Sequence, residues 1–425
     1  MKDEYMTTHV TLEDAASHRT GQPGYGLPWA VTNDSLRDVV RKFRYLSPTA
    51  EIRTKWQYCN MMFIAISYLV EKVTGLWLGE FLRTRIYEPL NMTTTFFALS
   101  DARAAVAAGR VSLAQGYAWN NLTRSYISLP YMDKPVVSGA GATISTVLDY
   151  VKWLRCLMTM APPLSTAGHT AIRQPRITAP PNIEGTGFAD YDFYALGLQV
   201  SFYRGELMIW HTGALPGFGT IMAFLPEKQW GVVSMANTFE GGSVVNEILA
   251  FGLLDDMLGI PASERYDWGK RAEEVLANAS FVLNHAREIV YPEAPRSPVP
   301  HALPLQEYAG FYSHAAYPSL NLTLNSAYAD AESDWNSTAM PYLQTRSYHH
   351  FDSMYFSLEH VSGEYFLAHI RRHMDETPQP GNYDPWMDKV VKAEFRLGVD
   401  GRVKEMGIEI DPQLGEIKIW WQKQA

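Results

Sequence analysis

Cysteine is scarce in this chain, and long apolar runs are missing. Cys59 and Cys156 are the two cysteines among 425 residues, too few for a disulfide framework or a cysteine-rich metal site. No run of about 18 apolar residues occurs, so no membrane span is expected. The first residues, Met1 to Tyr5, also lack the apolar core of a signal peptide.

Basic charge is in deficit as well. The chain has 36 Lys and Arg against 45 Asp and Glu, a net charge of −9. No basic patch stands out, and a nucleic-acid partner is therefore not expected. Apolar residues make up 47% of the chain, which suits a globular protein with large cores.

Six Asn-x-Ser/Thr sequons contrast with the missing leader segment. Either the protein is secreted and its signal peptide is absent from this sequence, or the sequons occur by chance in a Ser/Thr-rich, cytoplasmic chain. The candidate glycosylation sites are Asn33, Asn91, Asn121, Asn278, Asn321 and Asn336.

A Tyr-x-Asn turn, Tyr58-Cys59-Asn60, precedes a predicted helix that should stop at Gly75. A phenol and an amide on a loop backed by a helix are a common way to present catalytic groups. The alternative is an ordinary loop in which Tyr58 and Asn60 satisfy backbone groups. The helix is predicted because four apolar residues recur at one-face spacing: Met62, Ile66, Leu69 and Val73.

The pattern along the chain predicts an α+β domain followed by a small β-barrel. Helices dominate up to about residue 154, strands are expected between Tyr194 and Asn237, and a covering helix follows at Val244–Leu258. The Gly-rich stretch Val136–Ala142 is expected to be a strand edge or tight loop. We therefore divide the chain into an α+β domain (1–265), a helical and Pro-rich linker (266–300) and a β-barrel (301–425).

A second motif, His211-Thr212-Gly213-Ala214, lies between two predicted strands. A His, a hydroxyl and a Gly on a sheet edge would make a receptor for a carboxylate or acyl group. The Gly lets a substrate lie alongside, and the amide of Ala214 could bind a developing oxyanion. A turn with a structural His is the alternative.

These motifs occur together with several others, in a fixed order. The sequence resembles the serine β-lactamase and penicillin-binding protein superfamily, in the branch of class C β-lactamases, D-aminopeptidases and related esterases. The tail, 301–425, looks like the lipocalin-like β-domain often appended to these enzymes. The other motifs that carry the resemblance are Ser17–Pro23, Val73–Gly75, Ile86–Met92, Gly139–Gly141 with Ser145-Thr146, and Tyr194–Leu198.

The resemblance implies acyl-enzyme chemistry on an amide or ester, with no cofactor and no metal. Tyr58 would match the family's base and Asn60 the amide that orients the substrate. His211 would stand where many members have Lys, with Thr212 and Gly213 along the substrate edge. The amide of Ala214 would be one oxyanion donor. The partner implied is a small-molecule or peptide substrate.

One family motif is missing from these residues: no Ser is followed by Lys at the third position. A truncated sequence or an inactive homologue would each explain this. A phenol has a pKa near 10, and acting as a base at pH 7 requires about 4 kcal/mol of stabilisation of its anion, mainly from nearby cations. Without the motif's Lys, Tyr58 is expected to stay protonated.

The sequence thus predicts a β-lactamase-like serine hydrolase that is inactive as this chain. Two alternatives remain: a non-catalytic homologue that binds a small molecule or peptide, and an acyltransferase of natural-product biosynthesis. A metal cluster around His369 and His373, with Asp375 and Glu376, is less favoured than a solvated group. Cys59 is expected to be a buried structural thiol.

Overall fold

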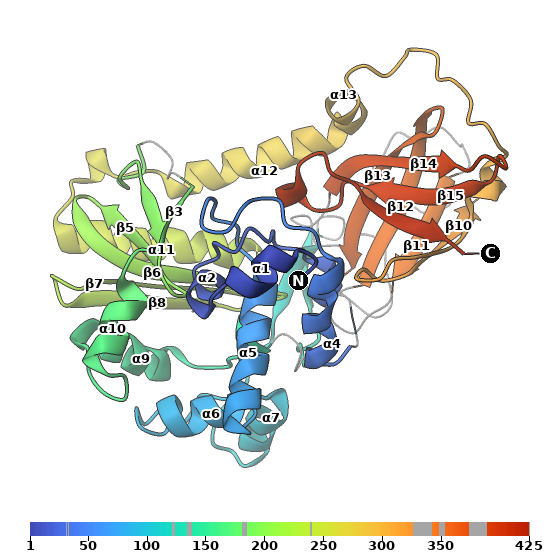
Figure 1. The fold of residues 1–425 in the computed structure, drawn as a ribbon. Coiled ribbons are helices and arrows are strands. Elements are labelled where there is room, and N and C mark those ends of the chain that lie inside the picture. The colour runs from blue at the N-terminus through green and yellow to red at the C-terminus, as the bar shows by residue number, and fades with distance from the viewer. Residues whose placement is uncertain are drawn as a thin grey trace. The chain divides into compact units, whose positions relative to one another are not determined.

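The computed structural model describes residues 1–30, 32, 34–120, 124–133, 138–180, 185–238, 240–325, 342–347, 353–373 and 389–424 (Figure 1). The chain divides into two compact units. The first comprises Met1–Gly24, Asp34–Ala118 and Ser128–Ala272, and the second Tyr25–Asn33, Trp119–Ile127 and Glu273–Ala425. The first unit combines helices with an antiparallel sheet and the second contains a closed barrel, the α+β and β-barrel architecture that the sequence predicts.

Local capping signals fix the helices of the first unit. Thr11 caps α2 (Leu12–Ala16) in a capping box with Asp14, and Ser35 caps α4 (Leu36–Arg41). α5 (Asn60–Thr74) ends at Gly75, whose φ is 71°. The other helices before the sheet are α1 (Glu4–His9), α6 (Leu78–Leu82) with a π-helical continuation (Arg83–Tyr87), α7 (Leu99–Ala107), α8 (Ser138–Gly141), α9 (Val147–Thr159) and α10 (Thr166–Arg173).

Two expectations about this helical region need correction. The described part of the Gly-rich stretch is no strand edge, because Ser138–Gly141 forms the short helix α8. The helix predicted from the apolar stripe is present as α5, but the stripe is buried only in part: Met62 is buried, whereas Leu69 and Val73 are exposed and Ser67 is buried in their place. The reason is that α8 packs against α5, where a Cβ added at Gly139 would lie 2.0 Å from Ser67 Oγ. Small residues, and not the longer apolar ones, make this contact.

The sheet of the first unit has six strands in sequential order, and every neighbouring pair is antiparallel. Of the strands expected between Tyr194 and Asn237, the sequence predicts the first as one continuous strand, Tyr194–Val200. This prediction is wrong, because a turn at 195–198 separates β4 from β5. The His211 motif lies inside β6 and not between strands. The strands are β3 (Ile177–Ala179), β4 (Asp192–Tyr194), β5 (Gln199–Tyr203), β6 (Glu206–Leu215), β7 (Phe218–Leu225) and β8 (Trp230–Ala236).

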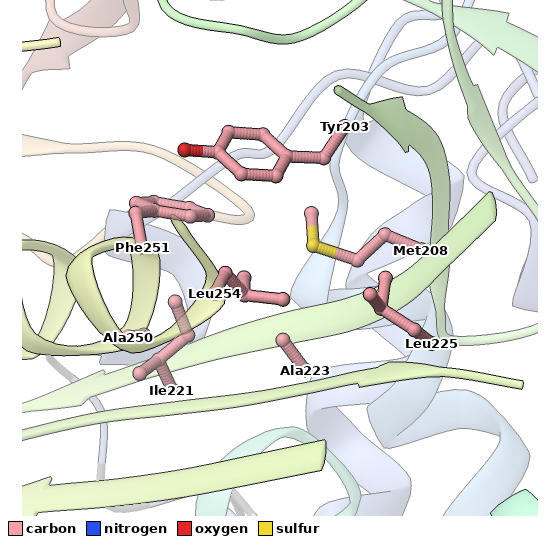
Figure 2. Close-up of a cluster of buried hydrophobic side chains, with 8 residues drawn as sticks. All are labelled: Tyr203, Met208, Ile221, Ala223, Leu225, Ala250, Phe251 and Leu254. Carbon is pink, nitrogen blue, oxygen red and sulfur yellow. The ribbon is translucent and has the colours of Figure 1, made fainter. Parts of the chain in front are cut away.

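Helices cover both faces of this sheet. On one face, Phe251 and Leu254 of α11 (Glu240–Leu258) pack toward Met208 and Ile221 of the sheet (Figure 2). On the other face, α9 contributes to a second cluster that includes Leu154, Leu157, Ile209, Met222 and Phe224. Burying a side chain such as Phe251 stabilises the fold by about 1.5–3 kcal/mol. The strands that carry the candidate site therefore lie between two packed layers.

The second unit contains a closed barrel of eight strands, each antiparallel to its neighbours. α12 (Trp268–Asn284) continues from the first unit into the second, and α13 (Ala286–Val290) follows. The strands are β9 (Gly310–Ser313), β10 (Leu320–Asn325), β11 (Tyr342–Ser347), β12 (Ser353–Ser362), β13 (Tyr365–His373), β14 (Lys389–Leu397), β15 (Val403–Ile408) and β16 (Ile419–Lys423).

Short elements complete the described part of the chain. Among the described residues, no single helix is both long and apolar enough to cross a membrane; Asn60–Thr74 and Leu78–Tyr87 meet that test of length and composition only as a pair bent by 76°. The remaining elements are α3 (Leu27–Ala30), a hairpin of β1 (Tyr117–Asn120) and β2 (Ser125–Ser128), and 3₁₀ turns at Lys42–Tyr45, Ala262–Glu264, Leu305–Tyr308 and Pro412–Leu414.

Candidate functional site

Hydrogen bonds join the Tyr-x-Asn segment to the residues around His18, which follow α2. The N–H of Arg53 donates to the carbonyl of Arg19 (2.7 Å), and the N–H of Gln57 donates to the carbonyl of His18 (2.8 Å). The N–H of Cys59 donates to His18 Nδ1 at 3.1 Å. His18 has φ +57°, a conformation that non-Gly residues adopt rarely and often at functional sites. Asn60 is then the first residue of α5.

Rings from distant parts of the sequence meet at this segment. The Tyr58 ring centroid lies 4.3 Å from that of His18 and 6.2 Å from that of His211. Tyr194 lies 4.9 Å from His18 and 6.0 Å from His211. Tyr58 and His211, which the resemblance implies as catalytic residues, are therefore close together. We call the following residues the aromatic cluster: His18, Trp56, Tyr58, Phe63, Tyr194 and His211.

The hydrogen bonds of His211 assign it as a neutral imidazole with its proton on Nδ1. Nδ1 lies 2.5 Å from the carbonyl oxygen of Thr212, which can only accept a hydrogen bond. Nε2 therefore accepts from the hydroxyl of Tyr194, 3.0 Å away. Burial lowers the pKa of His211 and raises the pKa of Tyr194, so both groups stay uncharged near neutral pH.

His18 is almost fully buried, with 1% of its surface exposed. Its Nδ1 accepts from Cys59, so its proton sits on Nε2. This Nε2 is buried and has no hydrogen-bond partner in the described part of the chain. Burial, with a smaller contribution from His211, lowers the pKa of His18 to about 3. The site thus contains a neutral donor that lacks an acceptor.

Tyr58 carries its proton in this structure. Burial raises the pKa of its phenol above the usual value, and the neighbouring Cys59 adds to the effect. The direction agrees with the sequence-based expectation that Tyr58 stays protonated. Both imidazoles beside it are neutral, so neither supplies the positive charge that would stabilise a phenolate.

The His211 motif runs along an open edge of β6. β5 pairs with β6 only up to Trp210, whereas β7 pairs with it up to Leu215. Gly213 faces β7, since its carbonyl oxygen lies 3.5 Å from Thr220 Oγ1. Backbone groups alternate in direction along a strand, so those of Thr212 and Ala214 point to the edge at which no described strand pairs with them. Thr212 and Ala214 are both exposed.

A buried carboxylate anchors the segments beneath the aromatic cluster. Asp14 is fully buried and binds the guanidinium groups of Arg19 (2.7 Å) and Arg53 (2.8 Å). Although burial alone would raise it, the pKa of the Asp14 carboxyl is held well below its usual range by hydrogen bonds from Arg53, Thr11 and Arg19. These ion pairs fix the two residues whose backbones connect the His18 and Tyr58 segments.

A groove of about 540 Å³ adjoins the cluster at Trp56. It follows β3, the edge strand of the sheet, and its lining includes Arg53, Lys55 and Arg176. Arg53 pairs with Asp14, and Arg176 pairs with Glu13 at 3.1 Å. The groove offers room beside β3, with the exposed Lys55 as a further cation of its lining.

The sequence missed His18 and Tyr194 as site residues. Both lie in motifs that carry the family resemblance, and that membership was the available signal. Of the sequons, Asn91, Asn278 and Asn321 are exposed, whereas Asn33, Asn121 and Asn336 lie outside the described residues. Asp375 and Glu376 also lie outside them, and in the described part of the chain His369 Nε2 is 3.3 Å from Glu359.

Comparison with known proteins identifies the families that the two parts of the chain match. Residues 3–253 match the family described as Beta-lactamase. Residues 294–423 match a domain of unknown function, DUF3471. An unguisins hydrolase of Aspergillus campestris is 36% identical over 434 residues, covering 100% of this chain and 75% of the relative.

Two further relatives extend the comparison. An unguisins hydrolase of Aspergillus violaceofuscus is 34% identical over 453 residues, with 100% of this chain and 75% of the relative covered. A D-aminopeptidase of Brucella anthropi is 25% identical over 277 residues, which are 62% of this chain and 48% of the relative. The octameric penicillin-binding protein homologue from Pyrococcus abyssi has the same fold, with a TM-score of 0.52 and 16% identity over 97% of this chain and 78% of that one.

Proposed function

The chain belongs to the Beta-lactamase family, and from that premise we propose that it carries the substrate site of an amide hydrolase that acts on a peptide-like substrate. The observation that carries the proposal is the meeting of Tyr58, His211 and the open edge of β6 in one site. Hydrolysis would convert the amide into a carboxylic acid and an amine. The names of the relatives, unguisins hydrolase and D-aminopeptidase, support an amide substrate.

The proposed binding mode uses the open edge of β6. The carbonyl oxygen of the substrate accepts from the amide of Ala214, and the substrate backbone lies along Thr212 and Gly213. Asn60 orients the amide, while Tyr58 and His18 act as neutral donors. The rest of a peptide-like substrate extends into the groove along β3.

These 425 residues contain no Ser-x-x-Lys, and we propose that they bind the acyl group without forming an acyl-enzyme. The raised pKa of Tyr58 supports this, because a protonated phenol cannot accept a proton from a nucleophile. The first test is a fluorophosphonate probe followed by mass spectrometry of the intact chain. No adduct is expected, and a covalent adduct on any residue would overturn this part of the proposal.

Binding is tested with an amide probe, N-acetyl-D-phenylalaninamide, by isothermal titration calorimetry. Ala214→Pro removes the proposed N–H donor at a position that needs no ladder hydrogen bond, whereas Ala214→Gly retains it. Loss of one hydrogen bond should weaken binding about 2- to 12-fold. Equal affinity of the two variants would contradict the placement of the carbonyl oxygen at Ala214.

Turnover is tested with the product of the gene's full reading frame and the same probe. Release of the free acid supports the hydrolase. Binding without release would favour the non-catalytic homologue, and transfer of the acyl group to an added alcohol would favour the acyltransferase.

A further inference from the structure

A separate cavity of about 270 Å³ lies in the first unit, at the end of the sheet away from the His211 motif. Its walls come from cross-strand neighbours, since Phe193 is opposite Val200, Val200 is opposite Ile209, and Phe202 is opposite Leu207. These five side chains are apolar and share one face of the sheet. Ile209 also belongs to the core that α9 covers on this face.

One cation adjoins this apolar surface. Arg173, the last residue of α10, lines the cavity, and its Nε and Nη2 atoms are buried without a hydrogen-bond acceptor in the described part of the chain. Its guanidinium lies 5.7 Å from the ring of Phe224. Arg173 takes part in none of the ion pairs that the described residues form. A guanidinium stays charged even when burial lowers its pKa.

A buried guanidinium without an acceptor destabilises the fold unless a ligand supplies that acceptor. A buried donor without a partner costs about 1–3 kcal/mol, and more when the group is charged. Nε and Nη2 are adjacent on the guanidinium and form the fork that binds the two oxygens of one carboxylate. The nearest acidic side chain of the lining, Glu227, is exposed and lies at no ion-pair distance from Arg173 among the described residues.

We propose that this cavity binds a monocarboxylate with a short apolar tail. The carboxylate would lie against Nε and Nη2 of Arg173, and the tail among Phe193, Phe202 and Leu207. The volume is roughly nine times the ~30 Å³ that a water molecule occupies in the liquid. An acid of about eight to twelve non-hydrogen atoms therefore suits the site.

Octanoate is the first probe, titrated into the full chain by calorimetry, with octanamide as its neutral counterpart. Octanoate should bind at least 10-fold more tightly than octanamide, because only the carboxylate pairs with Arg173. Arg173→Met should abolish this preference, whereas Arg155→Met, an exposed arginine of α9, should keep it. Equal binding of the acid and the amide, or an unchanged preference in Arg173→Met, would overturn the proposal.

Two further variants keep the test decisive if Arg173→Met folds differently. Leu207→Trp fills the tail region and leaves Arg173 in place, so it should reduce octanoate binding by 10-fold or more. Glu227→Gln should leave the affinity within 2-fold; a much larger gain would mean that Glu227 already occupies Arg173 and that the site needs no ligand. N-acetylleucine identifies where the bound carboxylate comes from. If it binds more tightly than octanoate, the ligand is a peptide C-terminus; if it binds more weakly, the ligand is a free aliphatic acid.

Discussion

The neutral state of His18 makes the stability of the first unit depend on pH in a predictable way. In the folded chain the pKa of His18 is about 3, against about 6.5 in an unfolded chain. Below pH 6.5 the unfolded chain takes up a proton that the folded chain does not. The free energy of unfolding should therefore be highest above pH 6.5 and fall as the pH drops toward 3.

The size of the effect follows from that difference in pKa. Each pH unit in the window is worth about 1.36 kcal/mol for one proton. Between pH 7.5 and pH 4.5, His18 alone should lower the free energy of unfolding by about 2.5 kcal/mol. His18→Asn removes the titrating ring and suits the positive φ of this position.

The assay is urea unfolding of the wild type and His18→Asn at both pH values. Other groups titrate in both proteins, so the difference between the two proteins isolates His18. The free energy of unfolding of the wild type, minus that of His18→Asn, should be about 2.5 kcal/mol smaller at pH 4.5 than at pH 7.5. His9→Asn, at an exposed position on α1, should not reproduce this change. A difference that is the same at both pH values would show that His18 is not held neutral by burial.

Two further substitutions test the contacts of the site and its scaffold. Tyr194→Phe removes the donor to His211 Nε2. It should raise the pKa of His211 by about 0.7, measured by NMR of the ring, because a hydrogen bond of about 1 kcal/mol favours the neutral form. The control is Tyr203→Phe, which removes a hydroxyl that donates to Asp255 at 2.9 Å and should leave the pKa of His211 unchanged. Gly139→Ala places a Cβ 2.3 Å from the carbonyl oxygen of Phe63. Urea unfolding should show that this lowers the free energy of unfolding by about 1–3 kcal/mol. The control is Gly252→Ala on α11, where the added Cβ has open space around it and should not destabilise the fold.

Local signals made much of the fold predictable from sequence. Thr11 and Gly75 mark helix ends through short-range chemistry, and the structure has helix ends at both. The apolar residues of Tyr194–Val200 suit a strand locally, and the sequence therefore predicts one there. The prediction failed because a long-range contact imposes a turn: Gly197 has φ +80°, and its N–H donates to the carbonyl of Ala16.

The candidate site was predictable in part, for a similar reason. Tyr58 and His211 stand in recognisable motifs, and their proximity in the structure agrees with that reading. His18 and Tyr194 matter through burial and through the tautomers that their neighbours impose. Neither property is visible until residues far apart in sequence are packed together.

Asp14 offers a test of whether the site depends on its anchoring ion pairs. Asp14→Asn removes the buried charge partner of Arg19, a mostly buried cation, and leaves it paired with the half-exposed Glu13. Removing one member of a buried pair costs about 3–5 kcal/mol. We expect about 3 kcal/mol, because Arg53 remains in contact with water. Glu13→Gln is the matched control, since the half-exposed carboxylate of Glu13 also binds Arg19 at 2.7 Å and should contribute less than about 1 kcal/mol.

The pH dependence of this variant separates an electrostatic role from lost packing. The folded-state pKa of Asp14 is lowered, so its stabilisation is present above its unfolded pKa of about 3.9 and is lost as the pH falls through the folded value. The gap between the wild type and Asp14→Asn in urea unfolding should therefore be widest near pH 7 and narrow below pH 4. A gap that stays constant down to pH 2 would mean that Asp14 acts through its shape and hydrogen bonds and not through its charge.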